Sequence, residues 1–221
     1  VYAPSFSCNS VYDGIEYSNA EVENYDVDEG FLPIIEKKIL ADEAVLIINY
    51  YGQLSRETVV DLKQKFGNII LDNSQAFFEK PIEDVDTIYN CRKFFGVPDG
   101  AYLFTDTKVN EMLPIDVSVN RMKHVLGRFD VNASTYFNLS KENNDRFQFE
   151  PIKRMSKLTK NLLCGIDYND VAYKRNQNAM CLHKELGNIN RLSFHIPRGA
   201  FMYPLWGKRG MGALLRKHLQ E

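Results

Sequence analysis

Two short stretches of the sequence place reactive side chains at the end of an expected strand. Asp72 follows an apolar run at residues 68–71, and Gln75 lies three residues further on. An aspartate in this position usually forms a turn or caps a helix, and that is the expected role of Asp72 when it is considered alone. Lys93 follows a second expected strand, at residues 86–90, and precedes a turn rich in glycine and proline. Lys93 is therefore the more unusual of the two acid–base candidates.

Aromatic and apolar residues surround Lys93 in the stretch CRKFFGVPDGA, which spans residues 91–101. Most lysines are solvated surface charges, so an apolar neighbourhood distinguishes this one. Burial disfavours the charged ammonium, and Arg92 next to it acts in the same direction, so we predict a lowered pKa for Lys93. A neutral amine is the form that attacks a carbonyl carbon, and Lys93 is therefore a candidate catalytic residue.

The opening segment, PSFSCNSV at residues 4–11, carries several small polar side chains, among them Ser7 and Cys8. Such side chains contact a cofactor in some proteins and cap a helix in many more. From composition alone, helix capping is the expected role of this segment.

The elements that must position these residues alternate between strands and helices in the first half of the chain. Continuous apolar runs and turn residues predict strands, whereas apolar residues three and four apart predict helices. Helices between strands imply parallel pairing and right-handed crossovers, and hence an open α/β sheet with helices on both faces. Ligands of such sheets bind beyond the carboxyl ends of the strands, where Asp72 would lie. The expected strands are 22–27, 44–49, 68–71, 86–90 and 101–105, and the expected helices are 32–40 and 55–66.

From about residue 117 the pattern becomes mainly helical. We expect Ser156 and Asp167 to cap two of these helices. The chain therefore divides into an α/β domain at residues 1–116 and a smaller helical and α+β part at residues 117–221. The elements expected in this second part are helices at 118–128, 140–146, 156–164, 168–186 and 211–219, and strands at 192–196 and 200–205.

Composition and charge exclude several classes of partner. The chain has 27 basic and 29 acidic side chains and a net charge of -2, so no overall field attracts nucleic acid or an anionic membrane. Its apolar runs are too short to span a bilayer and no signal peptide is visible, so we expect a cytoplasmic protein. Four cysteines and four histidines are scattered without the spacing of a metal site, and no metal is expected. No histidine is assigned a role.

In combination, these stretches resemble the DegT-like family, the nucleotide-sugar aminotransferases among the fold type I pyridoxal phosphate enzymes. The resemblance covers nearly the whole chain. It begins with residues 1–28 and continues through DNSQAFF at 72–78 and RKFFGVPDGAYLFTD at 92–106. Residues 154–186 resemble the helices that lead into the family's small domain. The resemblance implies fold type I, with an open and mostly parallel sheet, a smaller C-terminal domain that is incomplete here, and pyridoxal 5'-phosphate as cofactor.

The resemblance also implies roles for individual residues. Asp72 matches the aspartate that pairs with the pyridine nitrogen of the cofactor, which keeps the ring protonated and electron-withdrawing. Gln75 matches the glutamine near the phenolic oxygen of the ring. Lys93 matches the lysine that carries the cofactor and later moves a proton as a general base. Asp99 and Gly100 match the acidic-glycine turn that follows this lysine.

Other positions depart from the family pattern. The loop that holds the cofactor phosphate lies upstream of the matched region, and the chain also stops short of a full small domain, so the sequence is either a shortened gene product or a fragment. Cys8 stands where many members have a ring-stacking aromatic residue. Ile88 replaces a common serine, although Asn90 offers a polar contact nearer to Lys93. Ile152 stands near the place of an asparagine that many members lend to the neighbouring subunit. With Ser7, the residues Cys8 and Asn90 complete the expected cofactor contacts.

The activity implied by the resemblance is transfer of an amino group from glutamate or glutamine to a keto group on a nucleotide-linked sugar. A homodimer with shared sites and a place in polysaccharide synthesis are implied as well. A sugar dehydratase of the same family is a second interpretation, but those members replace the lysine with histidine, and Lys93 argues against it. A truncated, non-catalytic subunit or binding module is the third. Replacing Lys93 with alanine discriminates, because a binding role would survive the change.

Overall fold

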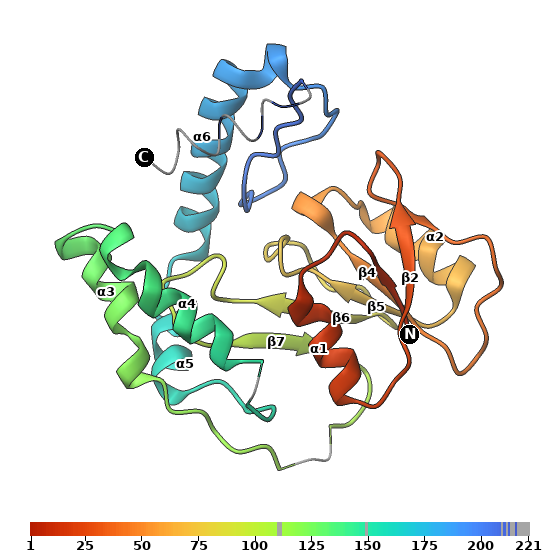
Figure 1. Cartoon of the computed structure of the whole chain (residues 1–221), viewed down its shortest axis with the longest axis horizontal. Coiled ribbons are helices and arrows are strands. Elements are labelled where there is room, and N and C mark those ends of the chain that lie inside the picture. Colours follow the sequence, from red (N-terminus) through yellow and green to blue (C-terminus); the bar gives the residue numbers. More distant parts are fainter. Residues whose placement is uncertain (110–111, 149, 209, 211, 213–214, 216–221) are drawn as a thin grey trace.

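The computed structural model describes residues 1–109, 112–148 and 150–208, together with residues 210, 212 and 215. Its centre is one open, seven-stranded sheet with the strand order β3-β2-β1-β4-β5-β6-β7 (Figure 1). The five inner strands are parallel, and the two edge strands, β3 and β7, are antiparallel to their neighbours. The predicted fold class, an open and mostly parallel α/β sheet flanked by helices, is confirmed. The strands are β1 (Tyr2–Pro4), β2 (Glu23–Val27), β3 (Pro33–Ile34), β4 (Val45–Ile48), β5 (Ile69–Asp72), β6 (Asp86–Asn90) and β7 (Ala101–Phe104).

The chain order reverses between β1 and β4, the two central strands of the sheet. From β1 the chain passes through helix α1 (Asn9–Tyr17) to β2 on one side, and from β4 it passes through helix α2 (Arg56–Phe66) to β5 on the other. A reversal of this kind opens a crevice at the carboxyl ends of the strands, because the two crossovers leave the sheet in opposite directions. The sheet topology thus fixes where a ligand would bind.

Helix α2 forms as predicted, with the capping residues and the buried face that its sequence indicates. Ser55 caps its start, since the Ser55 side chain accepts a hydrogen bond from the Thr58 amide at 3.1 Å. Gly67 ends it with a φ of 75°, a conformation that glycine adopts without strain. Val59, Leu62 and Phe66 are buried against the sheet. Strand β4 is buried along its whole length, as its continuous apolar run predicts.

The helix predicted at residues 32–40 is wrong. The Asp28 carboxylate accepts hydrogen bonds from the amides of Gly30 and Leu32, each at 2.8 Å, and this turn sends the chain back along β2. Pro33 and Ile34 then pair antiparallel with β2 as the edge strand β3. A proline suits such an edge because it has no N–H for a further strand to accept. The turn chemistry of Asp28 therefore overrides the helical spacing of the apolar residues.

The second part of the chain is mainly helical, as predicted. Ser156 and Asp167 cap α5 (Lys157–Cys164) and α6 (Tyr168–Leu186) through hydrogen bonds from amides of the first turn. The helix expected at 118–128 is instead a short 3-10 turn followed by a helix that ends at Asp130, and the one expected at 140–146 begins earlier, at Phe137. Figure 1 shows α6 rising away from the sheet and α3 beside α4. No helix among the described residues is long and apolar enough to cross a membrane. These helices are α3 (Lys123–Asp130), α4 (Phe137–Arg146), α5 (Lys157–Cys164) and α6 (Tyr168–Leu186), and the 3-10 turns are Tyr50–Gly52, Val119–Arg121, Ser134–Tyr136 and Gly187–Ile189.

The strands predicted at 192–196 and 200–205 are also wrong, because side-chain amides take the place of a strand partner. Gln53 accepts from the His195 amide at 3.0 Å and donates to the His195 carbonyl at 2.9 Å. The Asn176 side chain likewise donates to the Pro197 carbonyl and accepts from the Gly199 amide. These backbone N–H and C=O groups thus have hydrogen-bond partners without pairing to another strand. Most of the helix predicted at 211–219 lies outside the described residues.

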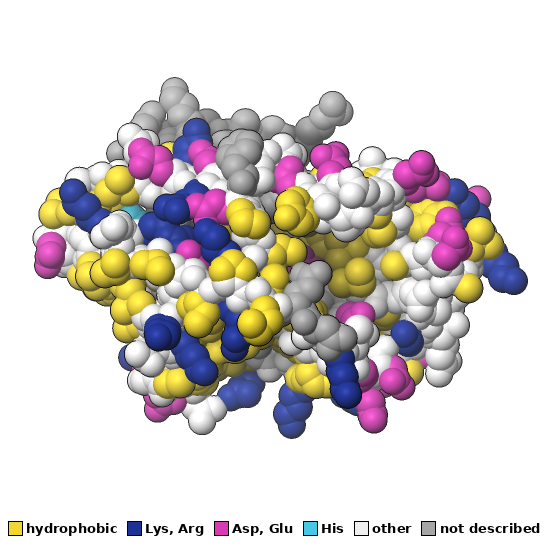
Figure 2. Space-filling view, turned by 90° about the horizontal axis from the view of Figure 1, so that it is seen from below, with side chains coloured by type: hydrophobic (Ala, Val, Ile, Leu, Met, Phe, Trp, Pro, Cys, Tyr) yellow, Lys and Arg dark blue, Asp and Glu magenta, His cyan; other side chains and the backbone are white. Residues whose placement is uncertain are grey.

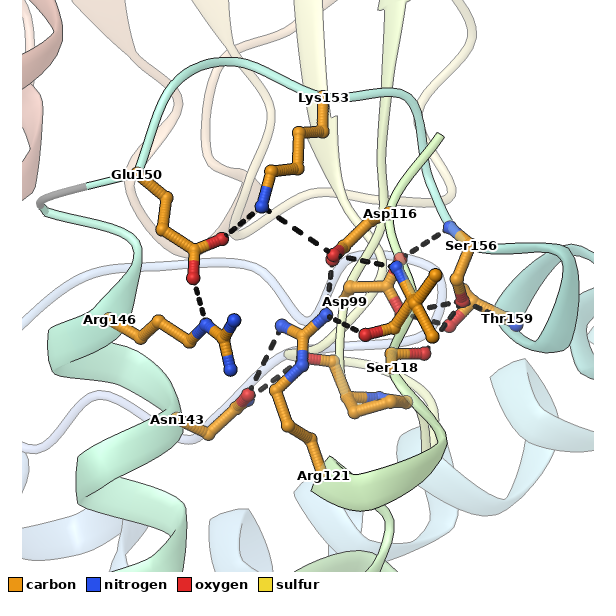
Figure 3. Close-up of polar contacts among 12 residues, drawn as sticks. Asp99, Asp116, Ser118, Arg121, Asn143, Arg146, Glu150, Lys153, Ser156 and Thr159 are labelled. Carbon is orange, nitrogen blue, oxygen red and sulfur yellow. Dashed lines mark hydrogen bonds and ion pairs between the residues drawn. The ribbon is translucent and has the colours of Figure 1, made fainter. Parts of the chain in front are cut away.

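A buried carboxylate joins the sheet to the helices (Figure 3). Asp99, in the loop between β6 and β7, is 2% exposed. It accepts hydrogen bonds from the Ser156 amide at 2.7 Å, from the Ser156 hydroxyl at 2.9 Å and from the Thr159 hydroxyl. The Ser118 and Ser156 hydroxyl oxygens are 2.7 Å apart. The first turn of α5 is therefore fastened to the loop that follows Lys93.

The surroundings of Asp99 favour its charged form. Burial by itself would raise the pKa of this carboxyl, but the hydrogen bonds from the Ser156 amide and from the hydroxyls of Thr159, Ser118 and Ser156 outweigh it and hold the pKa below the ordinary value. A carboxyl whose pKa is lower in the folded state stabilises the fold above its unfolded pKa, and this contribution is lost as the pH falls through the folded value.

We expect Asp99→Asn to lower the free energy of unfolding by about 1.5–3 kcal/mol at neutral pH, the usual contribution of hydrogen bonds to a charged group. The wild-type chain should lose this extra stability as the pH falls below about 4, and the variant should lack that part of the pH dependence. Urea unfolding at several pH values measures both effects. Asp61→Asn, on the exposed face of α2, is the matched control. Equal stabilities of Asp99→Asn and wild type at pH 7 would contradict the assignment.

Candidate active site

The segments that follow β1, β4, β5 and β6 meet at the carboxyl edge of the sheet. The Tyr50 hydroxyl donates to the Phe6 carbonyl at 2.5 Å, and the two rings stack with centroids 5.4 Å apart. The Asn49 amide nitrogen donates to the Asn73 side-chain oxygen at 3.0 Å, and both side chains are buried. These contacts hold the segments after β1, β4 and β5 together, and Lys93 joins the segment after β6 to them through Ser74.

Lys93 lies in this site, as predicted from the sequence. Its amine donates a hydrogen bond to the Ser74 hydroxyl at 2.9 Å, and the Ser74 amide in turn donates to the Asp72 carboxylate at 2.7 Å. The Lys93 amine also lies 5.6 Å from the centre of the Phe201 ring. The structure thus brings the predicted lysine and the predicted aspartate together, linked through Ser74.

The pKa of the Lys93 amine is lowered, in the direction that the sequence predicted. Burial is the largest cause; the charges of Asp72 and Cys8 oppose it, and the positive charge of Arg92 adds to it. The net effect raises the fraction of neutral amine at neutral pH. Neutral lysine is both a nucleophile and a proton acceptor, so this side chain is prepared for carbonyl chemistry.

The other predicted contacts lie nearby but serve mainly local structure. The Gln75 side-chain oxygen accepts from the Tyr51 amide at 3.1 Å, which holds Tyr51 at a φ of 56°. The Asn90 side-chain oxygen accepts from the Arg92 amide at 2.9 Å and so shapes the turn that carries Lys93. The Cys8 sulfur is exposed and lies 3.0 Å from the Ser10 hydroxyl.

Ser7 differs from these residues because its hydroxyl oxygen is buried and has no hydrogen-bond partner among the described residues. A buried hydroxyl without a partner is costly, and in a binding crevice it is available to a ligand. The resemblance places Ser7 among the cofactor contacts, and no described residue occupies its hydroxyl.

Sequence reasoning missed Arg175, in the middle of α6. Its guanidinium donates to the carbonyls of Lys93 and Phe94, each at 3.0 Å, and lies over the Phe94 ring at 4.8 Å. It also donates to the carbonyls of Ala200 and Phe201, at 3.5 and 3.4 Å. Arg175 therefore fixes the backbone that carries Lys93 and the segment whose Phe201 ring lies beside the amine. Nothing in the local sequence of α6 separates this arginine from a solvated one.

A cavity of about 660 Å³ opens beside Lys93, between α1, the turn after β6, and helices α3 and α4. Lys93, Arg92 and Asn90 line it on the side of the sheet, and His124, Arg128 and Asn144 are among the residues that line it from the helices. Figure 2, which views the molecule from below Figure 1, shows one group of Lys and Arg side chains on the left with exposed apolar side chains beside it. The volume is in the range that accommodates a small-molecule ligand.

His124 was given no role from the sequence, and the structure places it at the wall of this cavity. It is buried, and its pKa is lowered, first by burial and then by the charge of Arg128. An imidazole in this environment is neutral near pH 7. Ile152, which stands near an asparagine position of the family pattern, lines the same cavity with an apolar side chain.

Comparison with known proteins gives a limited picture. No protein-family model matches the chain, and no curated protein sequence matches it. Two solved structures that the chain resembles are the apo and the substrate-bound forms of BacF from Bacillus subtilis, at 15% and 17% sequence identity with TM-scores of 0.41 and 0.42. Each match covers 90% of this chain and 52% of the other, so the chain spans about half the length of these structures. Similarity at this level does not assign the chain to a family.

We expect the Lys93 amine to titrate below the ordinary lysine value of about 10.4 because burial disfavours its charge. Lys174 provides a contrast within the same chain, since its exposed ammonium pairs with Asp170 at 2.7 Å and its pKa is raised. Competitive acetylation across a pH series, read by mass spectrometry, gives a midpoint for each lysine. A Lys93 midpoint at or above that of Lys174 would contradict the geometry.

We expect Arg175→Met to move the Lys93 midpoint back toward the ordinary value, because the segment that shields the amine loses its anchor. Arg175→Lys should restore only part of the effect, since an ammonium cannot reach four carbonyls as a guanidinium does. The same acetylation series measures both variants, and Lys174→Met on the same helix is the control. A folded Arg175→Met variant with the Lys93 midpoint of wild type would show that Arg175 does not position the lysine.

Proposed function

We propose that the chain is the catalytic core of a pyridoxal phosphate-dependent aminotransferase of fold type I, with Lys93 as the residue that carries the cofactor. The observation that supports this most strongly is the pairing of a half-buried amine with a carboxylate across Ser74, at the carboxyl edge of an open parallel sheet. The DegT-like resemblance of the surrounding sequence supports the same reading.

The residues at the site fit this cofactor. Lys93 offers an amine with a lowered pKa, and Asp72 offers a carboxylate for the pyridine nitrogen. Ser7 offers a buried hydroxyl without a partner among the described residues. Gln75 follows Asp72 by three residues, and the Tyr51 amide already binds its side-chain oxygen, so its amide nitrogen would be the group that contacts the cofactor. When bound, pyridoxal phosphate would supply an electron-withdrawing ring that stabilises negative charge on the substrate carbon.

The chain's own residues would then carry out three tasks. Asp72 would hold the ring nitrogen in its protonated form through an ion pair. The Lys93 amine would accept a proton at its nitrogen and return it, which its lowered pKa favours. Ser74 would keep the amine directed toward Asp72 by the hydrogen bond at 2.9 Å. Phe201 and the apolar residues of the Lys93 turn would limit access of water.

The finer assignment follows from the resemblance alone. We propose a nucleotide-linked keto sugar as amino acceptor and glutamate or glutamine as donor. A homodimer is proposed on the same basis, and large apolar side chains exposed on α3 and ahead of it, such as Phe129 at 81% and Val117 at 76%, are consistent with a covered surface.

The test is direct. The purified chain with added pyridoxal phosphate should develop a visible absorption band that borohydride removes, and peptide mapping should find the reduced cofactor on Lys93. Lys93→Ala should lose both the band and the label, whereas Lys174→Ala, a change at an exposed lysine of α6, should keep them. A band that survives in Lys93→Ala, or a label spread over surface lysines, would refute the assignment. Absence of any band in a folded wild-type chain would favour the non-catalytic interpretation.

A further inference from the structure

The most unusual charge in the cavity beside Lys93 is the guanidinium of Arg92. It donates to the Asn144 side-chain oxygen at 2.6 Å and lies over the Phe147 ring at 4.3 Å, and both partners come from the C-terminal part of α4 and the residue that follows it. Arg92, Asn144 and Phe147 all line the cavity. The guanidinium is therefore held in one orientation at the cavity wall, with donors left over beyond the single bond to Asn144.

No carboxylate of the described residues lies within 4.0 Å of this guanidinium, so its charge is uncompensated by an ion pair. Burial is the largest cause that lowers the pKa of Arg92, and the positive charge of Arg121 adds to it, whereas the carboxylate of Asp99 opposes both without forming an ion pair. Arg121 itself is paired with Asp116. An arginine that is largely removed from water without an anionic partner is costly to the fold.

Arg128 and His124, from α3, line the same cavity. Among the described residues, the Arg128 guanidinium makes a single hydrogen bond, a long one of 3.5 Å to the His124 carbonyl. Three carboxylates line the cavity as well, but none of them belongs to the turn after β6 or to α3. Glu150 pairs with Lys153 and Arg146, and Asp13, on α1, accepts a hydrogen bond from Gln148 at 3.4 Å. Asp145 lies on the exposed side of α4 and makes no ion pair among the described residues. The wall formed by the turn after β6 and by α3 thus carries excess positive charge.

We propose that this wall binds the oxyanion group of a small-molecule ligand, a phosphate or a carboxylate, with Arg92 as its main contact and Arg128 as a second one. A planar guanidinium fixed by Asn144 and Phe147 suits two-point recognition of an oxyanion. Because Arg92 directly precedes Lys93, the bound anion would hold the rest of the ligand next to the amine. The assignment deepens the proposed function and rests on it only for what happens at Lys93.

Anion binding is measured on the full chain without pyridoxal phosphate, so that it is separated from the cofactor test. Inorganic phosphate and glutarate are titrated by isothermal calorimetry in a buffer that contains neither. At least one of them should bind, and Arg92→Met should weaken it about tenfold or more, as expected for loss of hydrogen bonds to a charged group. Arg128→Gln should weaken it several-fold, and Arg56→Met, an exposed arginine on α2, should leave it unchanged.

Binding of phosphate identifies a phosphorylated ligand, and binding of glutarate identifies a carboxylate. If neither anion binds at millimolar concentration, or if Arg92→Met binds as well as wild type, the proposal is overturned. Should Arg92→Met fail to fold, the wild-type chain still gives an answer. The binding anion should slow modification of Arg92 by phenylglyoxal but not that of Arg56, and equal rates with and without the anion would overturn the proposal.

Discussion

The buried carboxylate of Asp99 is the constraint on which the arrangement of the site depends. It is charged in an interior position, so it requires donors, and the first turn of α5 supplies them through Ser156 and Thr159. Because Asp99 lies six residues after Lys93 in the turn between β6 and β7, satisfying it also fixes that turn against the helices. Gly100, at a φ of 107°, has the Thr159 side chain 2.9 Å from the place of a Cβ, so only glycine allows this approach without a shift.

Local chemistry made much of the fold predictable. Ser55 and Gly67 mark the ends of α2, Asp167 marks the start of α6, and the apolar run in β4 reads as a buried strand. The wrong predictions arise where residues distant in the sequence determine the local structure. The backbone near His195 looks like a strand in sequence, but Gln53, 142 residues earlier, satisfies both of its polar groups. The residue pattern of a single segment does not indicate a hydrogen-bond partner so distant in the sequence.

The candidate site divides in the same way. Lys93 could be singled out because its apolar neighbours are adjacent in sequence, and the direction of its pKa follows from them. Asp72 could be placed because it ends a strand. Two other residues could not be predicted. Ser74 links Lys93 to Asp72, and Arg175 holds the lysine backbone from 82 residues away. A serine in a turn and an arginine in a helix have ordinary surface roles in most proteins, so the sequence does not distinguish them. The cavity forms where α3 and α4 meet the turn after β6, and this tertiary contact is not visible in the sequence of any one element.

The contact between Arg175 and the Lys93 carbonyl determines when the site can form during synthesis on the ribosome. The sheet and the lysine turn are made first, but the arginine that fixes them is synthesised 82 residues later, and Phe201 later still. A nascent chain that has only reached α5 can pair its strands and bind Asp99, yet the Lys93 backbone still lacks the hydrogen bond from Arg175 and the Lys93 amine lacks the Phe201 ring beside it. The reactive geometry therefore forms only after α6 and the segment that carries Phe201 have been synthesised, which keeps an activated amine from forming earlier.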